Sequence, residues 1–167
     1  NRALIYFGSS APFELISKVL KAFKRVDLSI FLDLIVGSNQ PNKKQLETLC
    51  NSNDMIQFHG MLPNLAKIMG EADLSIGAGG ATTLERLCMG LPSIVISTDD
   101  NQIPSSIALD DKGYQKYLGS NEKVNVVMIV DAINFFVNEP ENLVAQSIAG
   151  NKLVDGNGVN RILNEIS

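Results

Sequence analysis

The segment from Gly77 to Thr83 has the residue types and spacing of an anion-binding turn. It reads Gly-Ala-Gly-Gly-Ala-Thr-Thr, between an apolar run that predicts a strand and a periodic run that predicts a helix. Glycines lack Cβ atoms, so an anion can approach the backbone, and a helix N-terminus adds about half a positive charge. Many strand-to-helix turns are glycine-rich for backbone reasons alone, so both interpretations stay open.

Glu85 follows this segment on the first turn of the expected helix. Helical side chains tilt toward the helix N-terminus, so Glu85 can face a ligand bound there. A carboxylate only accepts hydrogen bonds, which suits the two hydroxyl groups of a ribose. Residues 82–85 also fit a capping box, in which Thr82 is the N-cap and Glu85 bonds back to its amide. The local sequence alone favours the cap over the ligand role.

Three further groups are candidates for chemistry. Ser9 and Ser10 follow the first expected strand and would either donate to a phosphate or cap the next helix. His59 is the single histidine, and the sequence places no Ser, Cys or Asp to complete a triad with it, which favours a structural role. Residues 99–102 (Asp-Asp-Asn-Gln) mix donors and acceptors that suit sugar hydroxyls, or they form an ordinary solvated loop.

Short apolar runs alternate with amphipathic stretches, as in a parallel sheet covered by helices. The expected strands are residues 3–7, 30–36, 55–58, 73–78, 93–97 and 117–118. The expected helices are residues 13–23, 43–50, 65–72, 84–91, 104–112 and 124–137, although the valines of the last segment favour a strand. The sequence therefore predicts an α/β fold, a Rossmann-like open parallel sheet with helices on both faces, and ligands at the carboxyl ends of its strands.

Composition and charge narrow the function classes. The 167 residues fit one domain, and 45% hydrophobic content is that of a globular protein. A net charge of −4 without a long basic cluster argues against nucleic acid. Cys50 and Cys88 lie outside any metal-binding motif, which favours a reducing, cytoplasmic location. No apolar run reaches the ~20 residues that span a membrane, and we see no signal-peptide pattern.

Several motifs, taken in order, resemble one enzyme family. They are Phe58-His59-Gly60-x-Leu62-Pro63, the glycine-rich turn with Glu85-Arg86, Gly90-Leu91-Pro92, Asp100-Asn101-Gln102 and Asp155-Gly156-x-Gly158-x-x-Arg161. Together they resemble the second lobe of the UDP-sugar hydrolases of pseudaminic acid biosynthesis, which cleave UDP-2,4-diacetamido-2,4,6-trideoxy-β-L-altropyranose to the free sugar and UDP. The resemblance implies a GT-B fold, similar to that of the N-acetylglucosaminyltransferase of lipid II synthesis.

The resemblance also implies a set of ligand-binding residues. Residues 60–62 would meet the uracil, Glu85 the ribose diol, and the loops at 8–10 and 79–83 the diphosphate. The implied UDP-binding residues are Gly8, Ser9, Ser10, Gly60, Met61, Leu62, Gly79, Gly80, Ala81, Thr82, Thr83 and Glu85, and the implied sugar-binding residues are Asn101 and Gln102. No cofactor and no metal are implied. Relatives often have a glycine pair where this chain reads Gly8-Ser9-Ser10.

The catalytic groups of the resembled family lie in an N-terminal lobe with a glycine-rich loop and a histidine that His59 does not match. The chain opens directly into its first expected strand. We therefore expect residues 1–167 to be a single UDP-binding C-terminal lobe, without catalytic residues of its own. Its expected partners are UDP or a UDP-sugar and an N-terminal lobe of the same protein, and neither nucleic acid nor a membrane.

Three alternatives remain at this point. A GT-B glycosyltransferase lobe would use the same UDP site and pass the sugar to an acceptor. A dinucleotide-binding oxidoreductase is the second, since Gly77-x-Gly79-x-x-Thr82 approximates that fingerprint and Asp99 follows 22 residues after Gly77. However, that fingerprint belongs on the first strand of its fold, and here it follows the fourth. A nucleotide-sugar sensor without catalytic activity is the third.

Overall fold

The computed structural model describes residues 1–9, 11–26 and 29–166. Its strands are β1 (Arg2–Tyr6), β2 (Phe31–Ile35), β3 (Ile56–His59), β4 (Leu74–Gly77), β5 (Ser93–Ser97) and β6 (Lys116–Ser120). Its helices are α1 (Phe13–Arg25), α2 (Lys43–Asn51), α3 (Ala66–Glu71), α4 (Thr82–Cys88), α5 (Ile103–Asp110), α6 (Val126–Asn138), α7 (Glu141–Leu153) and α8 (Gly158–Ile166), with a 3-10 turn η1 (Asp100–Gln102) before α5.

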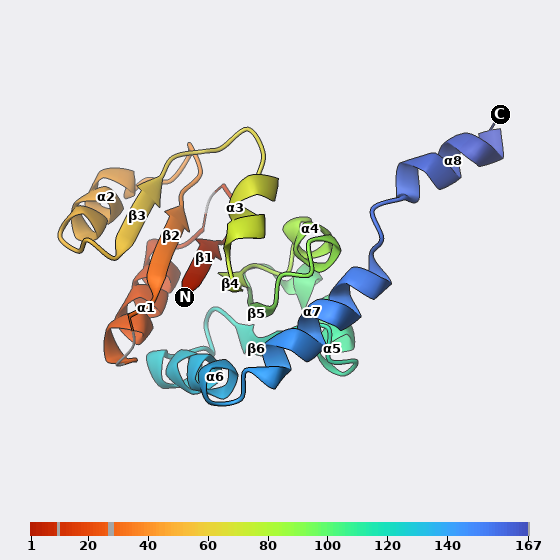
Figure 1. The fold of residues 1–167 in the computed structure, drawn as a ribbon. Coiled ribbons are helices and arrows are strands. Elements are labelled where there is room, and N and C mark those ends of the chain that lie inside the picture. The colour runs from red at the N-terminus through yellow and green to blue at the C-terminus, as the bar shows by residue number, and fades with distance from the viewer. Residues whose placement is uncertain (10, 27–28, 167) are drawn as a thin grey trace.

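The six strands form one sheet in the order β3-β2-β1-β4-β5-β6 (Figure 1). Every neighbouring pair is parallel, with Leu4 opposite Asp33 on β2 and Ser75 on β4. A parallel strand needs a crossover connection, and the amphipathic stretches between the strands supply it. This architecture confirms the predicted Rossmann-like α/β fold.

Alternate residues of β1 enter two different apolar cores. Ala3 and Ile5 pack in the larger core, which α1 and α6 share. Leu4 packs in a smaller core with Ile68 and Met69 of α3. Successive side chains of a strand point to opposite faces, so the sheet is covered on both sides, as predicted.

The ambiguous stretch before residue 138 is a helix. Asn125 caps α6, because its Oδ1 accepts from the amides of Val127 (2.9 Å) and Met128 (3.1 Å). Ile129, Ile133 and Phe136, which recur at helical spacing, are fully buried against the sheet. The apolar stripe therefore outweighs the strand preference of the valines.

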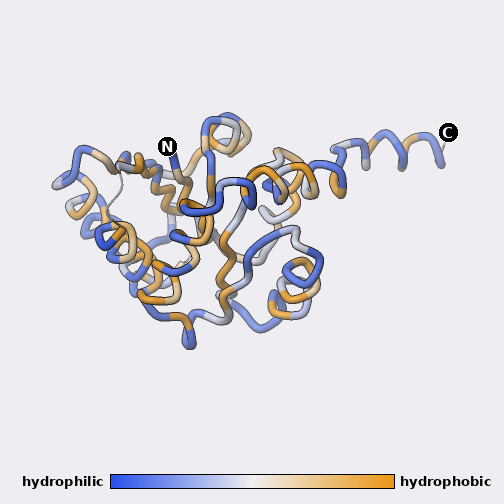
Figure 2. The backbone as a smooth tube through the Cα atoms, turned by 60° about the horizontal axis from the view of Figure 1, so that its bottom comes forward, coloured by the Kyte–Doolittle hydropathy of each residue, from blue (hydrophilic) through white to orange (hydrophobic). Residues whose placement is uncertain are grey.

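The two last helices were not among the predicted elements. α7 packs against α4, and the Gln146 side chain accepts a 2.8 Å hydrogen bond from the Ser93 amide at the start of β5. α8 projects away from the sheet (Figure 1), and its apolar residues are exposed along the projecting segment (Figure 2). Among the helices of the described chain, none is long and apolar enough to cross a membrane.

Candidate functional site

The strand order reverses direction between β1 and β4, because the chain runs outward from β1 through β2 to β3 and then returns to β4. In such sheets, ligands bind in the crevice beyond the carboxyl ends of the two strands at this point. Two cavities open there, of about 400 Å³ and about 580 Å³. Tyr6 and Thr82 line both of them, so the two cavities are contiguous.

The smaller cavity, which we call the turn cavity, lies between the loops that follow β1, β4 and β5. Its lining comprises Tyr6, Phe7, Gly8, Ser9, Ala11, Pro12, Ala78, Gly80, Ala81, Thr82, Thr98, Asp99 and Gln102. Predicted phosphate-binding residues from two separate loops therefore meet here. Ser9 donates no side-chain cap to α1, whose N-cap is Pro12. Ser10 was predicted alongside Ser9 and lies outside the described residues.

Two glycines shape the first of these loops. Gly8 has φ +91°, a conformation that residues with a Cβ rarely adopt, although a Cβ there would meet nothing within 4 Å. Gly37, in the loop after β2, is required for a different reason: a Cβ would lie 2.3 Å from the Cα of Ser9. Gly37 therefore lets a neighbouring loop support Ser9, a contribution that sequence patterns did not indicate.

The glycines of the turn after β4 have different roles. A Cβ on Gly77 would lie 2.6 Å from the Tyr6 carbonyl oxygen, and one on Gly79 would lie 2.3 Å from Ser106 Oγ. Those two glycines are needed for packing. A Cβ on Gly80 would have no neighbour closer than 3.7 Å, and Gly80 lines the turn cavity. The amides of Gly80 and Ala81 donate to no acceptor in the described chain, so they are available to an anion.

The larger cavity, which we call the apolar cavity, is bounded by the loop after β3, by α3 and by α4. Its lining comprises Tyr6, Met61, Leu62, Pro63, Asn64, Leu65, Ala66, Met69, Thr82, Leu84, Glu85, Cys88 and Met89. Apolar side chains dominate, and Glu85 is its one carboxylate. Such a surface, with few polar groups to fix orientation, suits a flat ring attached to a hydroxylated sugar.

The predicted capping box is wrong. α4 begins at Thr82, its N-cap position is Ala81, and no side chain caps it. Thr82 already has a helical neighbour before it, and its Oγ1 accepts a 3.0 Å hydrogen bond from Arg86 Nη1 instead of bonding an amide. Glu85 is exposed, and its carboxylate accepts no hydrogen bond within the described chain. It is therefore free to bind a ligand.

The two predicted sugar-binding residues, Asn101 and Gln102, differ in position. Gln102 lines the turn cavity, where its Oε1 accepts from the amides of Gly79 (3.2 Å) and Thr98 (3.1 Å). Its Nε2 donates to Asp99 Oδ2 at 3.2 Å. Gln102 therefore ties the loop after β5 to the glycine-rich turn. Of the other predicted ligand residues, Gly60, Gly79, Thr83 and Asn101 line neither cavity.

His59 does have an acidic partner, which the sequence did not reveal. Its Nε2 lies 2.7 Å from Oδ1 of Asp33, and Arg2 Nη2 donates to the same oxygen at 3.0 Å. Asp33 is fully buried, and its hydrogen bond raises the pKa of Arg2. These residues, the Asp33 cluster, sit on three adjacent strands and line neither cavity. The three strand positions are far apart in sequence, so only the sheet register brings them together.

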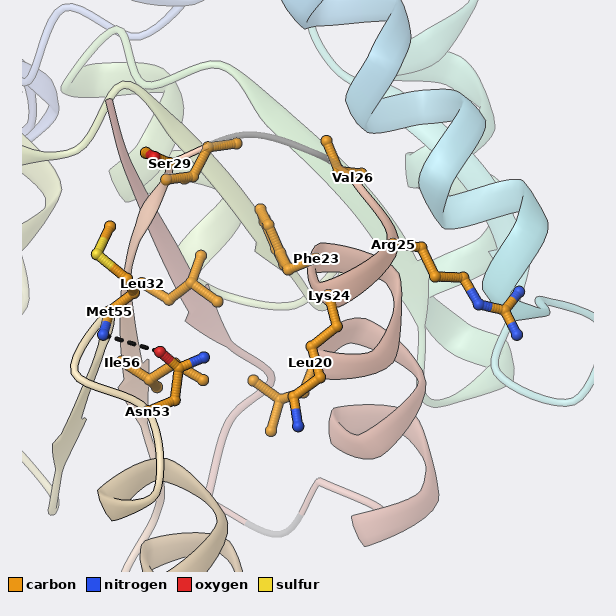
Figure 3. Close-up of a pocket in the computed structure, with 11 residues that line it drawn as sticks. Leu20, Phe23, Lys24, Arg25, Val26, Ser29, Leu32, Asn53, Met55 and Ile56 are labelled. Atoms are coloured by element: carbon orange, nitrogen blue, oxygen red, sulfur yellow. Dashed lines mark hydrogen bonds between the residues drawn. The ribbon is translucent and has the colours of Figure 1, made fainter.

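A third cavity, of about 620 Å³, opens at the opposite end of the strands, between the end of α1 and the starts of β2 and β3. Figure 3 shows Phe23, Leu32 and Ile56 along its walls, and the Asn53 side chain bonding the Met55 amide. Parallel sheets place their chemistry at the carboxyl ends of the strands, and this cavity lies at the amino ends. No group of three metal-ligating side chains occurs in residues 1–9, 11–26 and 29–166.

Residues 3–157 match the model of the glycosyltransferase family 28 C-terminal domain. The chain belongs to this family. Over 163 residues the family 28 chain is 26% identical to the spore coat polysaccharide biosynthesis protein SpsG of Bacillus subtilis, covering 95% of this chain and 48% of SpsG. The chain thus spans about half the length of this curated relative.

Two solved structures have the same fold. MurG of Acinetobacter baumannii superposes with a TM-score of 0.79 at 19% identity, over 99% of this chain and 49% of MurG. MnaA of S. aureus, solved with UDP, superposes with a TM-score of 0.77 at 17% identity, over 99% of this chain and 45% of MnaA. At these identities the likeness establishes the fold, which is that of a GT-B C-terminal lobe.

Proposed function

We propose that this family 28 chain is the nucleotide-binding lobe of a glycosyltransferase that uses a UDP-linked sugar. The observation that carries the proposal is the pair of contiguous cavities at the point where the strand order reverses. One is apolar with a single free carboxylate, and the other is polar and lined by free backbone amides. The family description and the UDP in the MnaA structure support this ligand class.

In the proposed binding mode, the uracil lies in the apolar cavity beside Met61 and Leu62. Glu85 accepts hydrogen bonds from the ribose hydroxyls at the boundary between the cavities. The diphosphate passes Thr82 into the turn cavity, toward Gly8 and Ser9 and the amides of Gly80 and Ala81. The sugar then lies near Asn101 and Gln102.

The chemical role proposed for this chain is to hold and stabilise the leaving group. When the bond between sugar and diphosphate breaks, negative charge develops on the diphosphate, and preorganised amide and hydroxyl donors stabilise it. We assign no catalytic base to this chain. We propose that the base and the acceptor belong to an N-terminal lobe of the same protein. The free thiols of Cys50 and Cys88 are in keeping with a cytoplasmic location.

The second candidate is hydrolysis, with water in place of the acceptor, as in the UDP-sugar hydrolases of pseudaminic acid biosynthesis that the motifs resemble. The specific observation in its favour is the Asp100-Asn101-Gln102 motif, whose last residue lines the turn cavity. Both candidates use the same UDP site and differ only in what attacks the sugar.

Calorimetric titration with UDP, ADP and NAD tests the binding proposal. We expect UDP to bind with the highest affinity, and a preference for NAD would contradict the nucleotide-sugar assignment. The reaction is then tested with UDP-sugars in the full-length protein, with and without added acceptor glycans. Release of free sugar and UDP without an acceptor identifies a hydrolase, whereas turnover that requires an acceptor identifies a transferase.

A further inference from the structure

Arg86 is a buried cation directly behind the glycine-rich turn. Only 2% of it is exposed, and it lines neither cavity. Its Nη2 donates to the Ala78 carbonyl oxygen (2.8 Å) and to Thr83 Oγ1 (3.2 Å), and its Nη1 donates to Thr82 Oγ1 (3.0 Å). All three acceptors are neutral, and the Nε atom has no hydrogen-bond partner among the residues that the structure describes.

This charge lacks the usual compensation. Buried arginines are normally paired with a carboxylate, because removing a charge from water is costly. Within the described chain, no carboxylate oxygen forms an ion pair with Arg86. Burial lowers its pKa to about 10, although attraction to Glu85 acts in the opposite direction. Arg86 is therefore still a cation at neutral pH, and no ion pair within the described chain neutralises its positive charge.

The turn is built to accommodate the guanidinium. A Cβ on Gly77 would lie 2.9 Å from Arg86 Nη1, so the glycine leaves the space that the arginine occupies. Two of the three groups that Arg86 bonds, Ala78 and Thr82, line the turn cavity. The guanidinium charge is therefore separated from the turn cavity only by the residues to which it donates hydrogen bonds.

The bond to Thr82 has a chemical consequence for a ligand. A hydroxyl group has one proton to donate and two lone pairs that accept. Because Arg86 donates to Thr82 Oγ1, the Thr82 proton remains available to donate into the cavity that Thr82 lines. The bond to the Ala78 carbonyl likewise occupies an oxygen that would otherwise repel an anion. Both bonds favour an anionic occupant of the turn cavity.

We propose that Arg86 is a positioning residue for a diphosphate, orienting the Thr82 hydroxyl and supplying the buried positive charge behind the turn cavity. The proposal rests on the proposed nucleotide site and adds the group that makes it selective for polyanions. A buried charge is screened little by salt, so its effect persists at physiological ionic strength. An arginine that only stabilised the fold would need the same hydrogen bonds, but the effect of replacing it would not depend on the charge of the ligand.

The test compares uridine, UMP and UDP binding to the full-length protein by calorimetry. In Arg86→Gln, which removes the charge, we expect uridine affinity to stay within about twofold of the original value and UDP affinity to fall roughly tenfold or more, with UMP between them. Arg86→Lys retains the charge and should recover part of the UDP affinity. Equal losses for all three ligands, or a change in melting temperature alone, would overturn the proposal.

Two threonine variants provide a matched pair that also decides the outcome if Arg86→Gln does not fold. Thr82→Val removes the hydroxyl that lines the turn cavity, and it should weaken UDP more than uridine. Thr83→Val removes another acceptor of Arg86, but Thr83 is buried and lines neither cavity. It should leave the ratio of UDP to uridine affinity unchanged. The same ratio in both variants would contradict the role of the Thr82 hydroxyl.

The wild-type protein separates this proposal from the proposed function. If it does not bind UDP, the nucleotide site itself is wrong. If it binds UDP in preference to uridine and Arg86→Gln keeps that preference, only the role of Arg86 is wrong.

Discussion

Asp33 and Arg86 are both almost completely buried charges, but their surroundings differ. The Asp33 carboxylate meets Arg2 and His59, which lie on the neighbouring strands, and the cluster is satisfied within the protein. The Arg86 guanidinium meets only neutral oxygens and keeps one nitrogen without a partner. A charge that the protein neutralises itself contributes to the fold, whereas a charge left uncompensated beside a cavity suggests a ligand. Burial alone does not distinguish the two.

The largest expected effect is on stability, at the Asp33 cluster. Asp33→Ala removes the buried acceptor of the partly exposed Arg2 and His59 side chains, and losing hydrogen bonds to a charged group costs roughly 1.5–3 kcal/mol. We expect the free energy of unfolding, measured with urea, to fall by about that amount. Asp131→Asn, at an exposed position of α6, is the control and should change little. If the Asp33 variant loses UDP affinity but not stability, the two regions have been assigned the wrong way round.

Glu85 should show the opposite behaviour. Charge-assisted hydrogen bonds to the ribose contribute roughly 1.5–3 kcal/mol each, so Glu85→Gln should weaken UDP by about ten- to several-hundred-fold. The melting temperature without ligand should stay within a few degrees of the original value, because Glu85 has no capping role to lose and solvent screens its attraction to Arg86.

Two comparisons sharpen that result. The mutation should cost almost nothing against 2′,3′-dideoxy-UDP, which lacks the hydroxyls that Glu85 would bind. Glu14→Gln, at an exposed position of α1, should leave UDP affinity intact. If Glu85→Gln binds UDP as tightly as the original protein does, the assignment of Glu85 to the ribose site is wrong.

Gly8 and Gly113 form a matched pair that tests the proposed phosphate role of the loop after β1. Both have a positive φ (+91° and +73°), and an added Cβ on either would meet nothing within 4 Å. Alanine should therefore strain each backbone to a similar extent, about 1–2 kcal/mol. Gly8 lines the turn cavity and Gly113 does not, so only Gly8→Ala should also weaken UDP. Equal ligand affinities in the two variants, measured by calorimetry, would argue against a phosphate role for this loop.

The sequence predicted the sheet more completely than the site. Short apolar runs identified each strand because hydrophobic periodicity is a local property, and the stripe of Ile129, Ile133 and Phe136 identified α6. α7 was missed because its apolar residues, such as Val144 and Ile148, are largely exposed and form no core-facing stripe. The sequence feature that could have indicated the start of α7 is Pro140, which precedes the helix.

In the site, contiguous motifs were easier to predict than contacts between distant residues. The glycine-rich turn was recognised from local spacing and the ligand role of Glu85 from the family resemblance; Gly80 and Thr82 of the turn and Glu85 line the cavities. The Asp33–His59 contact depends on strand register across 26 positions, which no local pattern contains. The capping box was wrong because residues 82–85 have the right types, but Thr82 is already helical and its hydroxyl bonds Arg86. A buried arginine four residues after that threonine was the missed signal.

The smallest expected effect is at the ion pair between Asp155 and Arg161, which repeats the chemistry of the Asp33 cluster at the surface. Arg161 donates to both Asp155 oxygens (2.8 and 3.0 Å), and these hydrogen bonds hold the pKa of Asp155 well below its usual range. A carboxylate whose pKa is lower when folded stabilises the protein above its unfolded pKa of about 4, and this contribution disappears as the pH falls through the folded pKa. Both side chains are largely exposed, however, so solvent screens the pair. Asp155→Asn should therefore shift the melting temperature at pH 7 only slightly, and by even less at pH 2–3. A loss as large as that of Asp33→Ala would mean that pairing, rather than burial of the pair, decides how much such a contact stabilises this protein.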